Sequence, residues 1–520
     1  MGNNKKALGA ESRNYANDIV FSNFIIPEKL NKETVMQNMP VVLNDIMSLF
    51  QQKHVNISFN CILNVLLTKT AQMITAKRVT FKEVDNVLIP NWYSIIFMPS
   101  GGGKDRLSKD LDNSIFSDFR QWFKTSADNY KLNEENKINR IANEKYPDYK
   151  SEKQKQMFIN TEKEKIRNVV IEMQNGTQEG FYSDAKAFDK ANFGSLFLKI
   201  SEFGLYLKSI NTEKEMFLDC LYNAYDGKVI SKCIKGSNRE PDIENLPVNI
   251  LLYSDYTLFK ADIKGLFNTL MATGLNRRSV ISFRPITDRI APRFTYEQKH
   301  LFSSTAEKIK NNLYNIFNRI NQRACYQLLE TTNDNVLNPY VQYLNDLYNK
   351  TDDLILKSEI ESREIKSLKL SCLYACLNHP EDLNIYETDL KQAIMTIQLL
   401  SKDLEAFNNY KPRKNDKYDL LYNSLKSNID KQYTKTEMKR LLMSLGWTRR
   451  NAYKDFDEIV EYIKEIAGND NYSFIEQQIN NNSGTKYFLQ QINPSINDDK
   501  IIPLPNLLMV NAENLANPNK

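Results

Sequence analysis

The sequence predicts an α/β core built on a parallel sheet, flanked by all-α regions and followed by a module of three helices and a β-hairpin. Four short apolar runs with helical stretches between them predict the sheet, because strands that alternate with helices usually lie parallel and are joined by crossovers. Glycine and proline are scarce, with 16 of each in 520 residues, which favours long helices. A chain of this length is too long for a single hydrophobic core, so we expect about three domains.

The composition narrows the class of protein. Hydrophobic residues form 41% of the chain and charged residues 26%, which is typical of a globular protein and excludes wholesale disorder. Lys and Arg number 69 against 64 Asp and Glu, and the net charge of +5 permits a nucleic-acid partner without arguing for one. The sequence shows neither a membrane-spanning apolar segment nor a signal peptide, so we expect a cytoplasmic protein without a membrane partner. Its six scattered cysteines are expected to be reduced thiols.

The apolar pattern organises the first part of the chain. Residues 1–85 form an N-terminal region with expected helices at Val41–Phe50 and Ile57–Thr75. Residues 86–290 form the α/β core, with a charged helical insert at 105–173 that we interpret as a solvated arm. The strands expected in this core are Trp92–Met98, Ser195–Ile200, Val248–Tyr253 and Val280–Phe283.

Three further regions follow the core. Residues 291–410 are expected to be helical throughout, because apolar residues recur there at three- and four-residue spacing. Residues 411–492 contain three expected helices and two strands around the turn-forming segment 480–485, an order that is typical of a winged helix. Residues 493–520 are rich in Asn and Pro and are expected to form a flexible tail.

A cluster of three glycines follows the first expected strand. Successive glycines let backbone N–H groups turn toward an anion, the next helix adds positive potential, and Lys104 can reach the β- and γ-phosphates of a nucleotide. The match to GxxxxGK[ST] is incomplete, because Met98 replaces the first glycine and Asp105 the Ser or Thr. A flexible turn is the alternative, although Asp105 could itself bind Mg²⁺. The residues assigned to this phosphate site are Ser100, Gly101, Gly102, Gly103, Lys104 and Asp105.

Polar residues end two other expected strands. Glu202 comes shortly after Ser195–Ile200, where a P-loop ATPase keeps the carboxylate that orients metal or attacking water, so we assign it catalytic and metal-binding roles. Ser254 and Asp255 end Val248–Tyr253 and are candidates for contact with a γ-phosphate. Ordinary strand-end or helix N-terminal caps are the alternatives for all three residues.

Two arginines, Arg277 and Arg278, precede the last expected strand. An arginine at the edge of a subunit can neutralise the transferred phosphate of its neighbour, as an arginine finger does. The alternative is a solvated basic turn.

The densest basic patch lies in the C-terminal module. In a helix-turn-helix the start of the second helix meets the major groove of DNA, and the surrounding cations contact phosphates. We therefore expect DNA binding there, with protein docking as the alternative. The residues assigned to DNA binding are Lys439, Arg440, Arg449, Arg450 and Lys454.

The order of these motifs resembles that of one family. It is the P-loop ATPase family that phages, plasmids and integrative elements encode beside or fused to primases, and which is similar to the superfamily 3 replicative helicases. The likeness covers about Val41 to Leu400, including the helical stretch Ser362–Leu400. The segments that carry it are SGGGK (Ser100–Lys104), TQEGF (Thr177–Phe181), SEFG (Ser201–Gly204), NAYDGKV (Asn223–Val229), YSDYT (Tyr253–Thr257) and GLNRR (Gly274–Arg278).

The resemblance implies ATP and Mg²⁺ as cofactors, with Lys104 on the phosphates, Glu202 as the catalytic carboxylate and Arg277 or Arg278 acting on the neighbouring subunit. It also implies a homo-oligomeric ring such as a hexamer, in the bacterial host cytoplasm, acting on single-stranded or forked DNA with a primase or polymerase partner. Two departures touch the metal: the loop ends GKD rather than GKS, and Ser201-Glu202 replaces an Asp-Glu pair. We expect an ATP-dependent DNA helicase or translocase in the replication of a phage or mobile element; the alternative is a non-hydrolysing P-loop scaffold or DNA-binding replication accessory protein.

Overall fold

The computed structural model describes residues 19–21, 24–26, 30–99, 103–148, 151–174, 177–208, 212–231, 241–254, 274–285, 295–409, 416–429, 431–445, 447–454, 456–469, 472–478 and 485–491. The chain divides into two compact units, residues 1–410 and 411–520. The three regions predicted before residue 411 share one hydrophobic core. The predicted tail at 493–520 lies outside the described residues.

A parallel sheet lies at the centre of the first unit, which confirms the predicted α/β class. Its order is β6-β7-β5-β8, and every neighbouring pair runs parallel. Met173 extends the sheet by an isolated parallel bridge to Leu198, on the outer side of β6. The four strands are β5 (Tyr93–Phe97), β6 (Leu196–Ile200), β7 (Val248–Ser254) and β8 (Ser279–Phe283).

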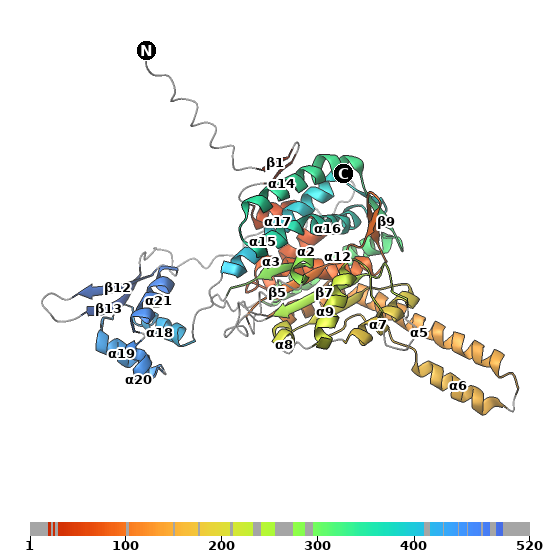
Figure 1. The fold of residues 1–520 in the computed structure, drawn as a ribbon, viewed down its shortest axis with the longest axis horizontal. Helices are drawn as coiled ribbons and strands as arrows, with labels where there is room; N and C mark the ends of the chain where they lie inside the picture. Colours follow the sequence, from red (N-terminus) through yellow and green to blue (C-terminus); the bar gives the residue numbers. More distant parts are fainter. Residues whose placement is uncertain are drawn as a thin grey trace, which may run out of the picture. The chain divides into compact units, whose positions relative to one another are not determined.

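Helices cover both faces of this core sheet (Figure 1), which explains why its strands are apolar without alternation. On one face α3 (Phe59–Thr75) packs on β5, β7 and β8. On the other face α9 (Thr212–Tyr225) approaches β5, where the hydroxyl of Tyr93 donates a hydrogen bond to the backbone oxygen of Leu221 at 3.0 Å. α17 (Glu387–Asn409) packs along β8. The sheet is thus buried on both sides, and only the ends of its strands can reach a ligand.

Asn64 on α3 joins the helix to the sheet through polar contacts. Its amide nitrogen donates to the backbone oxygen of Val280 at 2.9 Å and to the hydroxyl of Ser282 at 3.0 Å. Its amide oxygen accepts from the indole of Trp92 at 3.0 Å and from the hydroxyl of Ser94 at 2.6 Å. A buried polar side chain with all its bonds made specifies one arrangement of helix and strands.

A second, smaller sheet was not predicted. It has the order β10-β9-β3-β4 and joins the N-terminal region to the helical one. The expectation that 291–410 is helical throughout is therefore wrong, because two strands and a π-helical segment interrupt it. The elements involved are β3 (Thr80–Glu83), β4 (Asn86–Leu88), β9 (Cys325–Leu328), η3 (Asn333–Leu337) and β10 (Asn384–Ile385).

The charged insert forms a helical hairpin that projects from the first unit (Figure 1). The hairpin consists of α5 (Ser117–Lys145) and α6 (Glu152–Glu164), and α6 has no buried residue. The first residues of the insert instead belong to α4 (Lys104–Ser114), whose Leu107 and Leu111 lie in the hydrophobic core, so the interpretation as a solvated arm is wrong there. The insert is not helical to its end, since the chain from Lys165 to Met173 returns to the sheet as an extended segment. We call α5 and α6 together the helical arm.

The remaining elements of the first unit are short strands and helices around the two sheets. They are β1 (Ile19–Phe21), β2 (Phe24–Ile26), α1 (Lys32–Gln37), α2 (Val41–Lys53), α4 (Lys104–Ser114), α7 (Gln178–Ala191), α8 (Phe203–Lys208), α11 (Leu275–Arg278), α12 (Tyr296–Arg319), α13 (Glu330–Thr332), α14 (Asn338–Lys350), α15 (Leu354–Glu361) and α16 (Arg363–Asn378). Among the helices of the described segments, none combines the length and apolar character that crossing a membrane requires.

The second unit has its own hydrophobic core and a three-stranded antiparallel sheet. The sheet order is β11-β13-β12, with the long hairpin pair β12 and β13 in register from Tyr472↔Gln491 to Gln478↔Thr485. Its elements are α18 (Asp416–Lys426), β11 (Tyr433–Thr434), α19 (Lys435–Ser444), α20 (Arg449–Lys454), α21 (Phe456–Asn469), β12 (Tyr472–Gln478) and β13 (Thr485–Gln491). The short strand β11 was not predicted.

Candidate functional site

The parallel sheet gathers the predicted site residues at one edge. All four strands run in the same direction, so the segments that follow them leave the sheet on the same side. Lys104 comes after β5, Glu202 after β6, and Ser254 is the last residue of β7. We call this side the carboxyl edge of the core sheet. Residues 100–102 and Asp255, which were predicted to belong to it, lie outside the described residues.

Gly103 and Lys104 begin helix α4 at the carboxyl edge. Gly103 has a φ of 91°, a left-handed conformation that glycine adopts without strain. Lys104 is the first residue of the helix, and its side chain is 9% exposed. Lys104 thus stands at the N-terminal end of α4, where the helix dipole favours an anion.

Lys104 contacts the segment that follows β6. Its ammonium donates a hydrogen bond to the backbone oxygen of Ser201 at 2.8 Å and lies 3.5 Å from Oε1 of Glu202. The Glu202 side chain is 54% exposed, so this ion pair contributes little to stability and its carboxylate can exchange partners. A lysine and a carboxylate that follow two different strands thus lie in contact.

Asp105 adds a second carboxylate at the carboxyl edge. It is exposed in the first turn of α4, and its Oδ1 lies 3.5 Å from the hydroxyl of Ser201. Within the described segments, no group of three or more His, Cys, Asp or Glu residues is arranged to hold a metal ion. Mg²⁺ in nucleotide sites takes only one or two carboxylates and completes its shell with phosphate and water oxygens. Asp105 and Glu202 fit that donor set.

Ser254 is completely buried at the end of β7, and its hydroxyl has no hydrogen-bond partner among the described residues. It pairs with Phe97, the last residue of β5, and its backbone oxygen accepts from the N–H of Met98 at 3.0 Å. The hydroxyl is therefore held beside the start of the glycine loop. A buried hydroxyl without a partner costs about 1–3 kcal/mol, so this position is a candidate contact for a ligand.

Arg277 and Arg278 lie at the opposite edge of the sheet from Lys104. They precede Ser279, which pairs with Tyr93 at the amino end of β5. Arg277 forms an ion pair with Glu361 at 3.1 Å, and its side chain is 50% exposed.

Arg278 is held more firmly. Its guanidinium lies 3.5 Å from Asp226 and 5.4 Å from the ring centre of Tyr222, and its side chain is 28% exposed. Asp226 belongs to the NAYDGKV segment, for which the motifs suggested no role. Its contact with Arg278 gives that carboxylate a structural partner.

Two residues that the sequence motifs do not single out also lie at the carboxyl edge. Arg284 follows β8 directly, is 8% exposed, and donates its backbone N–H to the oxygen of Phe97 at 3.0 Å. Asp403 on α17 accepts from the N–H of Phe283 at 2.9 Å and from the side chain of Asn60 at 2.7 Å. Burial raises the pKa of Asp403 to about 6. The rule that strand ends carry site residues points to Arg284, whereas Asp403 has no signal beyond being a carboxylate on an apolar helix face.

A buried lysine holds α4 against the edge of the sheet. The ammonium of Lys69 lies 2.9 Å from Asp112 on α4 and 3.7 Å from Glu172, beside the bridge residue Met173. Lys199 on β6 also pairs with Glu172, at 3.5 Å. Burial lowers the pKa of Lys69, and the two carboxylates oppose that effect. The network connects the helix that begins with Lys104 to the strand that precedes Glu202.

The predicted DNA-binding cations lie on α19 and α20 of the second unit. Arg440, Arg449 and Arg450 are exposed. The ammonium of Lys439 lies 3.9 Å from the ring centre of Tyr453, so this cation already has an aromatic partner. Further along, α21 exposes the acidic residues Asp457 and Glu461, which disfavour contact with phosphates on that part of the helix.

The chain matches no protein-family model, and no curated protein matches it either.

Proposed function

We propose that this chain is an ATP-dependent DNA helicase or translocase that acts in the replication of a phage or mobile genetic element. One observation carries the proposal: Lys104, at the start of the helix after β5, contacts Ser201 and Glu202, at the end of β6. A lysine at a helix N-terminus and a carboxylate from another strand end of the same sheet are groups that phosphoryl transfer uses.

In this proposal the first unit is a P-loop NTPase. Strand β7, with Ser254 at its end, lies between the lysine strand β5 and the carboxylate strand β6. This order supports a site in which Lys104 holds the β- and γ-phosphates, Glu202 orients the attacking water, and Ser254 contacts the γ-phosphate. Asp105 and Glu202 would hold Mg²⁺, which offsets the charge of the phosphates when it is bound.

In this proposal the second unit is a winged helix that binds DNA. The order of the elements supports this: helix α18, strand β11, helices α19 to α21 and the hairpin β12–β13, with β13 between the other two strands. The described residues contain one helix more than the three that were predicted, because α20 and α21 stand where a single helix was expected. The exposed arginines Arg440, Arg449 and Arg450 would contact phosphates there, and Lys439 and Lys454 are the further cations assigned to DNA binding. Single-stranded or forked DNA is the proposed partner, with a primase or polymerase as a further one.

The second candidate function is a P-loop scaffold or replication accessory protein that does not hydrolyse ATP. Two observations favour it. Asp105 stands where a Ser or Thr would bind the metal, and it adds negative charge beside the proposed triphosphate. The Lys104 ammonium already has an acceptor of its own chain in Ser201.

Phosphate release from ATP, measured with Mg²⁺ and with or without single-stranded DNA, tests the two candidates. We expect Lys104→Ala to lower the rate by about two orders of magnitude and to weaken ATP binding, because a charge-stabilising donor is lost. Glu202→Gln should retain ATP binding and lose hydrolysis. Lys109→Ala is the matched control, since Lys109 is an exposed lysine on the same helix, and its rate should equal that of the unaltered chain.

The second candidate makes the opposite prediction. If the unaltered chain binds DNA but releases no phosphate from ATP, with or without DNA, the motor is excluded and the scaffold stands.

A further inference from the structure

A small cavity lies beneath α11, the helix that carries Arg277 and Arg278. Its volume is about 10 Å³, and its lining comes from α11, the start of β8 and the helices α15, α16 and α17. Aliphatic side chains form part of the wall. The polar part consists of Asn276, Ser279, Glu359, Lys366 and Ser401, each of them at most 9% exposed.

The polar groups of this cavity are unequally satisfied. Both carboxylate oxygens of Glu359 accept hydrogen bonds, one from Arg363 at 2.7 Å and the other from Ser401 at 2.6 Å. By contrast, neither the oxygen nor the nitrogen of the Asn276 side chain has a hydrogen-bond partner among the described residues, and neither does the hydroxyl of Ser279. Within the described segments, the Lys366 ammonium makes one long hydrogen bond, 3.4 Å, to the backbone oxygen of Asn276.

Such a set of buried groups is costly if the cavity is empty. Each unpaired amide or hydroxyl costs about 1–3 kcal/mol, and an ammonium costs more. A volume near 10 Å³ is about the smallest that holds one water molecule, and a water needs two to four polar partners, which this cavity provides.

We propose that the cavity binds one internal water molecule, which accepts a hydrogen bond from Lys366 and links it to the side chains of Asn276 and Ser279. Water fits better than a halide ion. Asn276 and Ser279 offer hydrogen-bond acceptors as well as donors. A water molecule can donate to such an acceptor, whereas a halide ion cannot. A halide would also lie near the carboxylate of Glu359.

The water joins α11 to the helices of the first unit's C-terminal part. Lys366 is on α16, whereas Asn276 immediately precedes Arg277. The water would fix the position of α11, the helix that carries Arg277 and Arg278, relative to α16. The side chains of Lys366 and Asn276 would not need to bond to each other directly. This consequence for the arginines rests on the proposed function, but the water site itself does not.

A crystal structure of the full chain at high resolution tests the site directly. We expect one isolated density peak within 3.2 Å of Lys366 Nζ and of the side chains of Asn276 and Ser279. An empty cavity would overturn the proposal. So would replacement of the peak by an anomalous bromide signal after soaking, because that result identifies a halide site.

A double-mutant cycle on thermal stability tests the bridge in solution. Asn276→Leu and Lys366→Met remove the polar side-chain groups while keeping a similar side-chain volume. The backbone oxygen of residue 276, which Lys366 contacts, is present with either Asn or Leu at that position. We expect the double variant to lose clearly less Tm than the sum of the single losses, since each single change leaves a water partner unpaired and the double change leaves fewer.

Lys369→Met is the matched control for the cycle. Lys369 is a fully buried lysine on the same helix, but it is bonded to Ile89, Asn91 and Tyr225 and does not line the cavity. Its loss of Tm should add to that of Asn276→Leu. Additive losses for the pair Asn276 and Lys366 as well would overturn the bridge, whether or not the chain hydrolyses ATP.

Discussion

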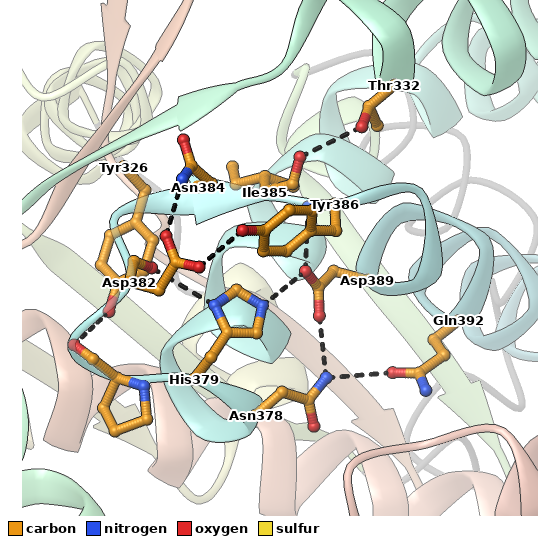
Figure 2. Close-up of polar contacts among 11 residues, drawn as sticks. Tyr326, Thr332, Asn378, His379, Asp382, Asn384, Ile385, Tyr386, Asp389 and Gln392 are labelled. Atoms are coloured by element: carbon orange, nitrogen blue, oxygen red, sulfur yellow. Dashed lines mark hydrogen bonds and ion pairs between the residues drawn. The ribbon is translucent and has the colours of Figure 1, made fainter.

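His379 lies at the end of α16, where both nitrogens of its ring face oxygen acceptors (Figure 2). Nε2 is 2.8 Å from the buried carboxylate of Asp389, and Nδ1 is 3.2 Å from the backbone oxygen of Asp382. Asp389 also accepts from the N–H of Tyr386 and from the side chain of Asn378. Burial opposes the charged ring, but the bond to Asp389 and its charge outweigh burial and raise the pKa of His379. The ring thus links the end of α16 to the start of α17.

A raised histidine pKa predicts how stability changes with pH. The folded state holds the proton more tightly than the unfolded chain, so the stabilisation is complete below about pH 6.5 and is lost as pH rises through the folded-state pKa. We expect His379→Gln to lower Tm most at pH 6, where a charge-assisted bond of about 1.5–3 kcal/mol is lost, and less at pH 8. Melting curves of the full chain between pH 5.5 and 8.5 measure this difference.

His300→Gln is the control for that series, because His300 is an exposed histidine on α12. Its Tm should follow that of the unaltered chain at every pH. An equal loss of Tm from His379→Gln at pH 6 and pH 8 would contradict this prediction.

At the scale of an element, the helical arm separates a buried root from an exposed tip. At the root, Phe119 and Phe123 of α5 are buried among other aromatic rings, including Phe317 and Phe193. Toward the tip, Lys163 and Glu135 form an ion pair at 3.0 Å across the hairpin, and α6 has no buried residue. The tip therefore adds little apolar burial to the core.

We expect the arm to be removable beyond that ion pair. Replacing residues 136–162 by a short Gly-Ser linker should change Tm by less than about 2 °C, because Ala142 is the one buried residue of the described part of this segment and it does not belong to the hydrophobic core. Phe123→Ala at the root should instead cost about 3–5 kcal/mol, through the cavity it leaves. Scanning calorimetry measures the Tm of both variants. A large loss of Tm in the linker variant would contradict the prediction, because it would show that the tip contributes to the stability of the fold.

Short elements show where prediction from sequence ends. The four strands of the core sheet are predicted to within one residue at each end, because each is a continuous apolar run buried on both faces. β9 and β10 escape prediction, since strands of four and two residues are too short for a pattern and are held by partners distant in sequence.

The same limit applies to the candidate site. Lys104 and Glu202 follow recognisable strands, so the sequence brings them to one edge. Asp403 depends on Asn60 and Phe283, which are more than 100 residues away, and only the fold reveals that contact.

At the scale of the whole molecule, the sheet keeps the arginines and Lys104 apart. Arg278 directly precedes β8 and Lys104 lies beyond β5, so the five residues of β5, about 13 Å of strand, lie between the two edges. Neither arginine can reach a phosphate on Lys104 of its own chain. If they act on ATP, they act on the site of a neighbouring subunit. Arg277 is the better candidate, because its side chain is the more exposed and Arg278 is held by Asp226 and Tyr222.

Mixing two inactive variants tests that arrangement. Lys104→Ala removes the phosphate lysine and Arg277→Ala the trans-acting arginine, so each alone should lose ATP hydrolysis. In a mixed ring, an intact Lys104 from one subunit meets an intact Arg277 from the next at about a quarter of the interfaces, and phosphate release should return in the mixture. The ratio of the two variants should matter, with a maximum at equal amounts. Co-purification of differently tagged variants establishes that mixed assemblies form; if they form and release no phosphate at any ratio, the arginine does not act across a subunit interface.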